Sequence, residues 1–595
     1  MPGKDARVNR PSPARLLERA VAAFQEGRWH ETESACRALA AAGRDGFEVR
    51  YLLGLVAERT GRAAEAVALL SEAARLNPAH PETRFNLGVA LARLGRFDEA
   101  VGAYDGAIAR QAGFADAHFN RGVALGALGR AEEARAAYER AAALAPADPQ
   151  AHHNLGATLA GLRRFEEALG AFDRALALDS RYARAFASRA GALFHLGRLD
   201  EALESCDRAI AADPRASEAW DSRALVLLEL DRPAEALESA DRAIAIAPGE
   251  ANAHYHRGNA LRELASVEEA IAAYERAIAL DPGHAAAHRN LADALLLCGD
   301  FARGWEAYAW RWRLSPGGAR PDITAPAWLG EAGVEGRTLL LHGEMGMGDT
   351  LQFCRYATQV ARLGARVILE APAPLVPLLR TLEGPAAVIA RGEAIPPHDG
   401  QCPLMSLPFA FRTDLATLPA AVPYLHADPA REAAWRSRLG PGTRRRIGLA
   451  WSGSAGLRND RRSLSLAQVL PLVGHGAEWY SVQKDVPGRD MAFLASQADL
   501  HDLGTAFADF ADTAAALSLL DLVVTVDTSV AHVAGALGKP VWILLPHVPH
   551  DWRWFREGER TPWYPTARLF RQPAPGDWDA VVREVAAAIA RLPAR

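Results

Sequence analysis

The chain has few cysteines and no long run of apolar residues. Its five cysteines show neither the spacing of a metal site nor that of a disulfide framework, which excludes both as the basis of the fold. Half of the residues are hydrophobic, yet no apolar run approaches the roughly 18 residues needed to span a membrane. Residues 1–12 are polar and lack an apolar signal core. We therefore expect a disordered N-terminal tail and a cytoplasmic protein.

The chain also lacks a large excess of charge of one sign. Its 67 basic and 72 acidic residues give a net charge of −5. No basic stripe stands out, which argues against a nucleic-acid partner. At 595 residues the chain is too long for a single core, so we expect several domains.

A period of 34 residues is present throughout residues 13–314. Proline and glycine recur on it, at Pro78, Pro146, Pro214, Pro248 and Pro282 and at Gly54, Gly88, Gly122, Gly156 and Gly258. Small residues at fixed helical positions let two helices approach closely, and a proline closes each unit. The pattern resembles the tetratricopeptide repeat, a helix–turn–helix unit of this length. The resemblance implies an all-α superhelix of about nine units, whose concave groove would bind an extended peptide.

Some units depart from this pattern. Arg163, Asp231 and Ala265 replace a turn glycine, and Ser180 replaces a closing proline. We expect weaker turns at these places and an intact period. The histidines of the array have no metal-ligand spacing, and we interpret them as ordinary helix-face residues: His118, His152, His153, His254 and His256.

The repeats end in an aromatic stretch, Trp305 to Trp312, and a Pro/Gly-rich linker is predicted over residues 315–336. The aromatics are expected to seal the last repeat against the next domain. From Arg337 onward, apolar runs alternate with helical segments, which is typical of βαβ units and parallel sheets. We predict two Rossmann-like domains, residues 337–440 and 441–595, with a ligand cleft between them.

In the first of these domains, a strand is predicted at residues 338–342 and a helix at residues 351–363. The glycine-rich turn between them matches neither a dinucleotide fingerprint nor a P-loop. In the second domain, strands are predicted at residues 446–451 and 479–483, with a polar loop at 452–462 and a helix near 466–473.

The most informative segment is Asp527-Thr528-Ser529, between an apolar run and the helical residues 530–537. A strand–turn–helix unit of this kind would direct four unpaired backbone N–H groups and a partial positive charge at a ligand above Thr528. Such a helix start is a ready anion site, with His532 one helical turn further on. The alternative is that Asp527 and Thr528 only cap the helix.

Three motifs resemble bacterial glycosyltransferases of the heptosyltransferase type (glycosyltransferase family nine), which have the GT-B fold. They are a G-D-x-L segment at Gly348-Asp349-Thr350-Leu351, a basic position at Arg462, and a D-T-x-x-x-H segment at residues 527–532. Repeats followed by such a pair of domains are also similar to the protein O-linked N-acetylglucosamine transferases.

The resemblance implies roles for individual residues. Asp349 would be the catalytic base, and the donor phosphates would be bound by Arg462, Asp527, Thr528, Ser529 and His532. Further residues could contact the donor or the acceptor, namely Glu344, Gly346, Gly348, Thr350 and Lys484. For Asp349 the alternative is a helix cap, and for Lys484 a solvated strand end. No metal or other cofactor is expected, because we interpret Asp577-Trp578-Asp579 as the cap of the last helix.

These motifs predict an inverting, metal-independent glycosyltransferase. It would move a sugar from a nucleotide-sugar to a protein hydroxyl selected by the repeat groove. The first sheet domain is much shorter than in true heptosyltransferases, and Ser529 stands where those enzymes usually have glycine. The alternatives are a non-catalytic scaffold with a degenerate GT-B pair, a transferase acting on a lipopolysaccharide or glycan, and a sugar-nucleotide epimerase.

Overall fold

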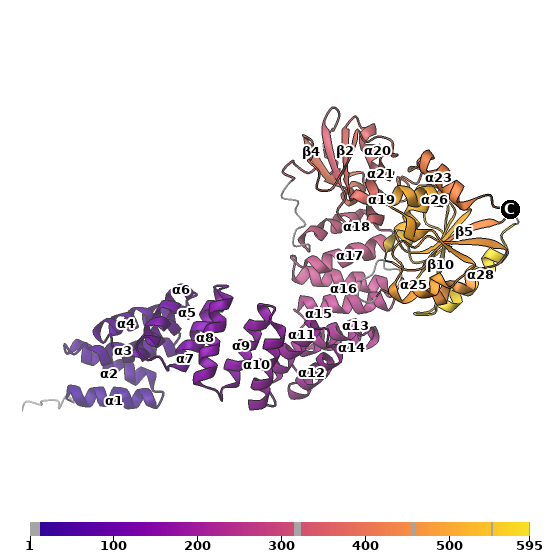
Figure 1. Ribbon diagram of the computed structural model, residues 1–595. Coiled ribbons are helices and arrows are strands. Elements are labelled where there is room, and N and C mark those ends of the chain that lie inside the picture. Colours follow the sequence, from indigo (N-terminus) through magenta and orange to yellow (C-terminus); the bar gives the residue numbers. More distant parts are fainter. Residues whose placement is uncertain (1–11, 315–322, 332, 454–459, 549–550, 594–595) are drawn as a thin grey trace, which may run out of the picture. The chain divides into compact units, whose positions relative to one another are not determined.

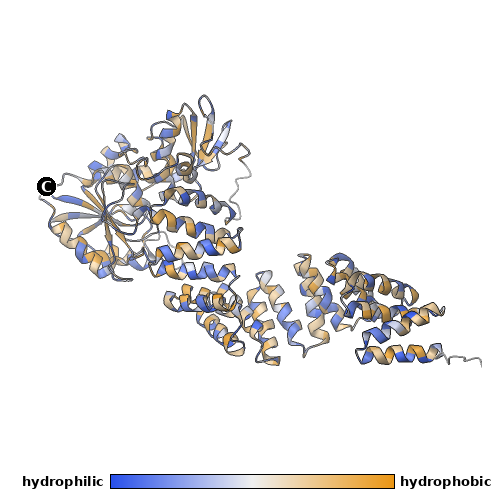
Figure 2. Ribbon diagram, turned by 180° about the vertical axis from the view of Figure 1, so that it is seen from behind, coloured by the Kyte–Doolittle hydropathy of each residue, from blue (hydrophilic) through white to orange (hydrophobic). Residues whose placement is uncertain are grey.

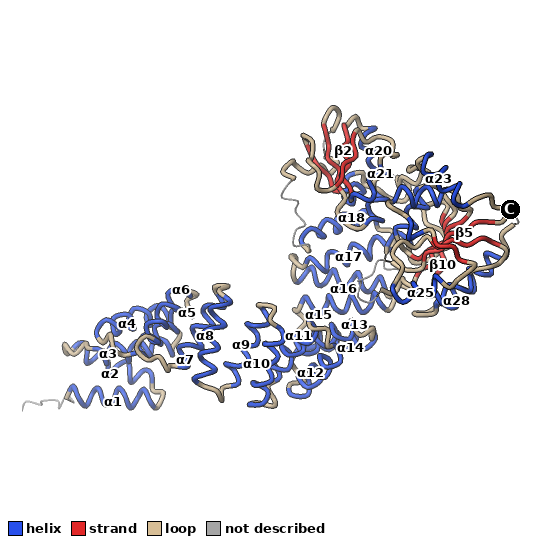
Figure 3. Tube along the Cα trace, in the orientation of Figure 1, coloured by secondary structure: helices blue, strands red, loops and turns tan. Residues whose placement is uncertain are grey.

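A computed structural model describes residues 12–314, 323–331, 333–453, 460–548 and 551–593. The predicted tail, except Ser12, and the first eight residues of the predicted linker lie outside these ranges. The chain divides into two compact units, residues 1–231 with 245–247, and residues 232–244 with 248–595. Among the described residues, strands occur only in the second unit, as Figure 1 and Figure 3 show.

Unit 1 is built from helices that pack as consecutive pairs. They are α1 (Pro13–Gln25), α2 (Trp29–Ala41), α3 (Phe47–Arg59), α4 (Ala63–Leu76), α5 (Pro81–Arg93), α6 (Phe97–Ile108), α7 (Ala115–Ala127), α8 (Ala131–Leu144), α9 (Pro149–Gly161), α10 (Phe165–Leu178), α11 (Ala183–His195), α12 (Leu199–Ala212) and α13 (Ser217–Glu229). Along the helices, hydrophobic residues alternate with hydrophilic ones, orange with blue in Figure 2.

Glycines of the repeats serve two purposes, close packing of helices and a left-handed turn. Gly88 lies where the two helices of a pair approach, and a Cβ atom there would lie 2.5 Å from the ring of Tyr104. Gly197 instead lies in the turn between α11 and α12, where its φ of +74° falls in the left-handed region. Arg163 occupies such a turn at φ +61° and Ala265 at φ +62°, so the backbone keeps a conformation that favours glycine.

The histidines of the array have local roles. His152 Nε2 lies 3.2 Å from the carbonyl oxygen of Pro146, and His254 Nε2 lies 3.2 Å from that of Pro248. Each ring therefore contacts the chain six residues before it, at the proline that closes the preceding unit. This agrees with their interpretation as ordinary helix-face residues.

Unit 2 begins with the remaining helices of the array and continues into the sheets. The helices are α14 (Pro233–Ile246) at the boundary of the units, α15 (Ala251–Glu263), α16 (Val267–Leu280), α17 (Ala285–Leu297), α18 (Phe301–Tyr308) and the 3₁₀ helix η1 (Ala309–Arg313). The aromatic stretch seals this end as expected, because buried Trp305 donates a hydrogen bond from Nε1 to the carbonyl of Thr413, at 2.9 Å. One hydrophobic cluster extends from Leu261 to Leu569.

The first sheet has four parallel strands in the order β3-β2-β1-β4. Its elements are β1 (Thr338–His342), α19 (Met347–Phe353), α20 (Arg355–Arg362), β2 (Arg366–Ala371), η2 (Ala373–Leu375), α21 (Val376–Leu379), β3 (Ala387–Ala390), β4 (Gly400–Pro403), η3 (Leu404–Ser406), α22 (Leu407–Ala410) and α23 (Pro429–Leu439). Leu339 pairs with Val367 on one side and Gly400 on the other. The chain order 3-2-1-4 places the point where the order reverses between β1 and β4.

The second sheet has six parallel strands in the order β10-β9-β8-β5-β6-β7. Its elements are β5 (Arg445–Ala450), α24 (Leu466–Val469), η4 (Leu470–Leu472), β6 (Ala477–Ser481), α25 (Gly488–Ala495), β7 (Leu500–Asp502), η5 (Gly504–Ala506), α26 (Phe510–Ser518), β8 (Leu522–Val526), α27 (Ser529–Ala536), β9 (Val541–Leu545), η6 (Trp552–Trp554), β10 (Ala567–Arg571) and α28 (Trp578–Ala590). Counted from β5, the order is 3-2-1-4-5-6, which is common in doubly wound α/β sheets. The order reverses between β5 and β8.

Several predicted boundaries were wrong. The helix expected at residues 351–363 starts earlier, at Met347, and is divided at Cys354 into α19 and α20. The helix near 466–473 becomes 3₁₀ after Val469, since Pro471 cannot donate to the α-helical ladder. Part of the expected linker belongs to the first sheet domain, because Ala327 bridges to Gln401 and Trp328 is buried.

Within the described residues, no helix is both long and apolar enough to cross a membrane.

Candidate functional site

The reversal point of the second sheet brings two predicted donor-site segments together. Arg462 follows β5, and its Nη1 donates to the main-chain carbonyl of Asp527, which follows β8, at 3.3 Å. Arg462 Nε also lies 3.1 Å from Oδ1 of Asp460. Ligands of doubly wound sheets bind beyond the carboxyl ends of the strands at this kind of reversal. Residues 454–459 of the predicted polar loop lie outside the described residues.

Helix α27 starts at this point with fewer unpaired amides than expected. The N–H of Ala531 donates to the carbonyl of Thr528 at 3.0 Å, so it is not one of four unpaired groups. The side chain of Thr528 makes no cap hydrogen bond, since its Oγ1 lies 3.1 Å from Oγ1 of Thr525. Thr528 thus occupies the N-cap position without capping the helix through its side chain, and the N–H groups of Ser529 and Val530 lie at the helix start.

Asp527 is almost fully buried beside this helix start. Burial raises its pKa to about 7, and the negative charge of Asp551 adds to the rise, whereas the positive charges of Arg462 and Arg553 oppose it. Burial therefore favours the neutral form of this carboxyl group, which lies beside the amides that would bind an anion.

His532 lies on the face of α27 that packs against α19. Its Nδ1 lies 2.9 Å from the hydroxyl of Tyr564, and the ring packs against Trp554. Burial lowers its pKa well below the usual value, with the charges of Arg553 and Arg355 acting in the same direction. The imidazole is therefore neutral and can donate a single hydrogen bond.

Gly348 gives α19 its close approach to this ring. A Cβ atom at Gly348 would lie 2.6 Å from Cδ2 of His532, closer than side chains pack. The G-D-x-L and D-T-x-x-x-H motifs thus meet in space, although the sequence alone could not show that these two helices are neighbours.

Asp349 has both carboxylate oxygens engaged. Oδ2 accepts a hydrogen bond from the N–H of Gly346 at 2.9 Å, which caps α19, and Oδ1 forms an ion pair with Arg553. Arg553 also pairs with Asp551 at 2.6 Å and is 5% exposed. The capping alternative for Asp349 is thus realised, and the same side chain joins the two sheets electrostatically.

Arg553 is the main residue near the site that the sequence motifs do not indicate. It lies in η6, where it is flanked by Trp552 and Trp554, and its guanidinium lies over the ring of Trp552 at 4.6 Å. The sequence feature that could have indicated it is a pair of opposite charges, Asp551 and Arg553, inside an aromatic segment. Buried charges without a partner are costly, so such a pair favours a functional or structural ion-pair network.

The other predicted contact residues are placed as follows. Glu344 is 5% exposed and forms a bidentate pair with Arg311 of η1, at 2.8 and 2.9 Å, and it also accepts from the N–H of Met405. Gly346 is the N-cap of α19, and buried Thr350 directs Oγ1 to the Gly346 carbonyl at 3.3 Å. The exposed Lys484 donates to the carbonyl of Phe507.

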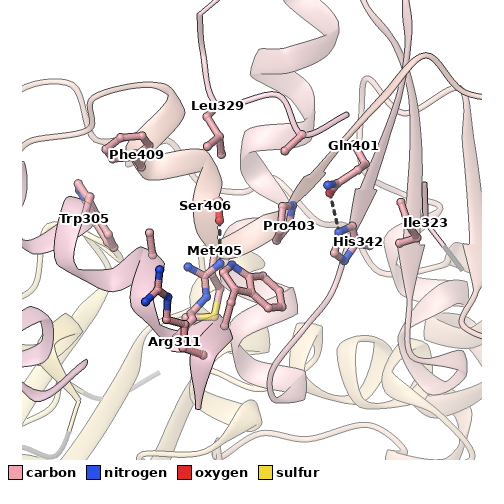
Figure 4. A pocket seen from close by; sticks show the side chains of 14 residues that line it. Trp305, Arg311, Ile323, Leu329, His342, Gln401, Pro403, Met405, Ser406 and Phe409 are labelled. Carbon is pink, nitrogen blue, oxygen red and sulfur yellow. Dashed lines mark hydrogen bonds between the residues drawn. The ribbon is translucent and has the colours of Figure 1, made fainter. Parts of the chain in front are cut away.

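A cavity of about 450 Å³ lies at the reversal point of the first sheet. His342 ends β1 and Gln401 belongs to β4, and they are joined by a 3.0 Å hydrogen bond across the strands (Figure 4). The remaining lining is aromatic, apolar and cationic, and includes Trp305, Trp312, Arg311, Arg313, Ile323, Leu329, Met405 and Phe409. The cavity and the donor-site segments thus occupy the corresponding edges of the two sheets.

Among the described residues, no three His, Cys, Asp or Glu side chains are grouped so that they could hold a metal ion. Asp577 caps α28, because its Oδ1 accepts from the N–H of Ala580 at 3.1 Å. This agrees with the interpretation of Asp577 as a helix cap.

The helical array matches the family models for such repeats. The model described as tetratricopeptide repeat matches residues 17–81, 85–149, 153–217 and 207–251, and the TPR repeat model matches residues 258–299. The array is composed of tetratricopeptide repeats.

Relatives of known name match over part of the chain. Protein FlbA of Caulobacter vibrioides is 27% identical over an alignment of 327 residues, and the match covers 49% of this chain and 52% of that protein. The chain thus spans about half the length of the curated relative it matches. The TPR protein YrrB, whose structure is described as having an unusual peptide-binding site, is 24% identical over 31% of this chain and 95% of its own, with a TM-score of 0.28. A tetratricopeptide repeat protein from Parabacteroides merdae is 21% identical over 41% and 97%, with a TM-score of 0.36.

Proposed function

We propose that the two sheet domains form a GT-B-type glycosyltransferase that moves a sugar from a nucleotide-sugar to a protein hydroxyl. The observation that supports this most is the ion pair between Asp349 of α19 and Arg553 of η6. It joins a carboxylate that follows the first strand of one sheet to a cation that follows β9 of the other. Helix α19 also packs against α27, whose start lies at the reversal point of that second sheet. Those are the groups that glycosyl transfer from a diphosphate requires.

The donor diphosphate would lie at the start of α27. The N–H groups of Ser529 and Val530 and the guanidinium of Arg462 supply hydrogen bonds and positive charge there. Arg553 would turn from Asp349 to the diphosphate. These groups stabilise the negative charge that develops on the leaving diphosphate without a metal ion.

In the transfer step, the acceptor oxygen forms a bond to the anomeric carbon of the sugar. The bond from that carbon to the phosphate oxygen breaks, and the nucleoside diphosphate leaves with the electron pair. The acceptor hydroxyl gives its proton to Asp349, whose Oδ1 becomes available once Arg553 has turned to the diphosphate. Attack on the face opposite the leaving group inverts the configuration.

The acceptor would be a protein segment guided by the repeats. Repeat arrays of this type present an extended surface to peptides. The cavity beyond β1 and β4 would take an apolar side chain of that segment, since aromatic and aliphatic groups line most of it.

A second candidate is a non-catalytic scaffold that binds a nucleotide or peptide. It is favoured by one observation: both oxygens of Asp349 are engaged, as in a purely structural residue. Both functions would include binding of a nucleotide, but only the transferase would turn over a nucleotide-sugar.

The test is a thermal-shift panel of UDP-, GDP-, ADP- and CMP-sugars on the full chain, followed by calorimetry with the best one. Ligands that bind only the folded state raise its stability by RT ln(1 + [L]/Kd). Arg462→Gln should weaken binding by about 1–3 kcal/mol, the range for a hydrogen bond to a charged group. Arg583→Gln, on α28, is the matched control and should bind normally. The absence of binding by every donor, or equal affinity in both variants, would overturn the proposal.

A further inference from the structure

A single turn of the repeat array contacts both cation-bearing segments of the proposed donor site. The turn joins α15 to α16 and carries Glu263 at its start and Glu268 just beyond it. Glu263 Oε2 lies 2.6 Å from Nη1 of Arg461, and Glu268 forms an ion pair with Arg556. Both partners belong to the second sheet domain, and all four residues lie in unit 2.

The partners of the turn are neighbours of the two site cations. Arg461 directly precedes Arg462, which bonds to the carbonyl of Asp527. Arg556 lies three residues after Arg553, which pairs with Asp349. Each acidic residue of the turn therefore contacts the chain close to one cation of the site.

The two contacts are unequal. Glu263 is 13% exposed, whereas Glu268 is 71% exposed and its pair with Arg556 lies in solvent. Exposed ion pairs contribute little, because water and salt screen them and fixing long side chains reduces entropy. Glu263 is also close to a second cation, since its Oε1 lies 3.2 Å from Nη2 of Arg262. The Glu263 contact is therefore the one that can restrain the main chain.

We propose that Glu263 is a positioning residue through which the repeat array holds Arg462 in the donor site, with Glu268 as a weaker second contact to the Arg553 segment. The expected effect of Glu263 on donor binding rests on the proposed function. It explains why a repeat array and a transferase would share one chain: the last repeats preorganise the diphosphate site as well as guiding an acceptor. Preorganised cations bind an anion more tightly, because less side-chain entropy is lost on binding.

The first experiment needs no ligand. Amide hydrogen exchange in the full chain should become faster in the peptide that contains residues 460–466 when Glu263 is replaced by Gln. Glu201→Gln is the matched control, since Glu201 pairs with Arg198 at 2.6 Å in another turn of the array, within unit 1. Unchanged exchange in the Glu263→Gln variant would overturn the proposal whatever the protein binds.

The second experiment measures donor affinity. Calorimetry with UDP, GDP and ADP should show affinity reduced by about three- to tenfold in Glu263→Gln. The charge-reversed pair Glu263→Arg with Arg461→Glu should recover part of the loss, which a merely structural role would not produce. Equal affinity in Glu263→Gln and Glu201→Gln would contradict the proposal. If the wild-type chain bound no nucleotide while the exchange result held, the proposed function would fail and the restraint itself would stand.

Discussion

Asp349 forms an ion pair with Arg553 across 204 positions of the sequence. The pair joins the helix that follows β1 of the first sheet to the segment that follows β9 of the second. In the proposed reaction, the diphosphate competes with Asp349 for the guanidinium, so arrival of the donor frees the carboxylate that takes the acceptor's proton. Donor binding would thus precede proton transfer.

Asp349 and Glu344 should respond differently to neutralisation. Asp349→Asn is expected to bind the donor and to lose about 10²–10⁴ in turnover, the range for loss of a general base. Glu344→Gln should instead lower the free energy of unfolding by about 3 kcal/mol, because Arg311 would remain buried without its partner. Turnover and denaturation are measured on both variants. A near-normal rate for folded Asp349→Asn would assign the base to another residue.

Transfer should not depend on a divalent ion. The cations and helix start at the reversal point of the second sheet can stabilise the leaving diphosphate by themselves. We expect the same turnover in EDTA as in added magnesium or manganese, measured by release of the nucleoside diphosphate. Loss of activity in EDTA and its return with either metal would show that this mechanism is wrong.

Gly348→Ala should destabilise the contact between α19 and α27. The added methyl group would lie 2.6 Å from the ring of His532, and overpacking of this kind costs about 1–3 kcal/mol. Gly170→Ala, inside α10 with open space around it, is the control and should be neutral or slightly stabilising. Chemical denaturation measures both. Equal stability of the two variants would mean that the helices can separate without cost.

A glycine at position 163 should stabilise the repeats. Arg163 has a φ of +61°, and a left-handed conformation costs a residue with a side chain about 1 kcal/mol relative to glycine. Arg163→Gly should raise the thermal midpoint, and Gly197→Ala, the opposite change at an equivalent turn of φ +74°, should lower it. Two shifts of the same sign would contradict this account of the turns.

Stability should depend on pH through Asp527. Its folded-state pKa of about 7 exceeds the value of about 3.9 in an unfolded chain, so the folded state holds the proton more tightly. The resulting stabilisation is complete below about pH 4 and is lost as the pH rises to about 7. The free energy of unfolding of the wild type minus that of Asp527→Asn should therefore fall by about 1–4 kcal/mol between pH 4 and pH 8. A constant difference over this range would show that folding does not raise the pKa of Asp527.

The repeats were predictable from the sequence because their determinants are local. A Cβ atom at Gly88 would collide with the ring of Tyr104, sixteen residues later, and the turn at Gly197 needs a positive φ. Contacts of such short range leave a regular period in the sequence. The alternation of apolar runs and helical segments likewise predicted the parallel sheets, since each strand and helix is encoded within its own segment. Strand order was not predictable, because it depends on pairing between distant segments.

The sequence by itself determined the repeat array, the two sheets and the strand–turn–helix unit at Thr528. Only the tertiary structure decided the partners of the charged residues: that Asp349 meets Arg553, that Glu344 is bound by Arg311, and that Glu263 reaches Arg461. The physical reason is range. Hydrophobic periodicity and turn geometry act between neighbours in the chain, whereas an ion pair is fixed by where packing of the core places two distant side chains.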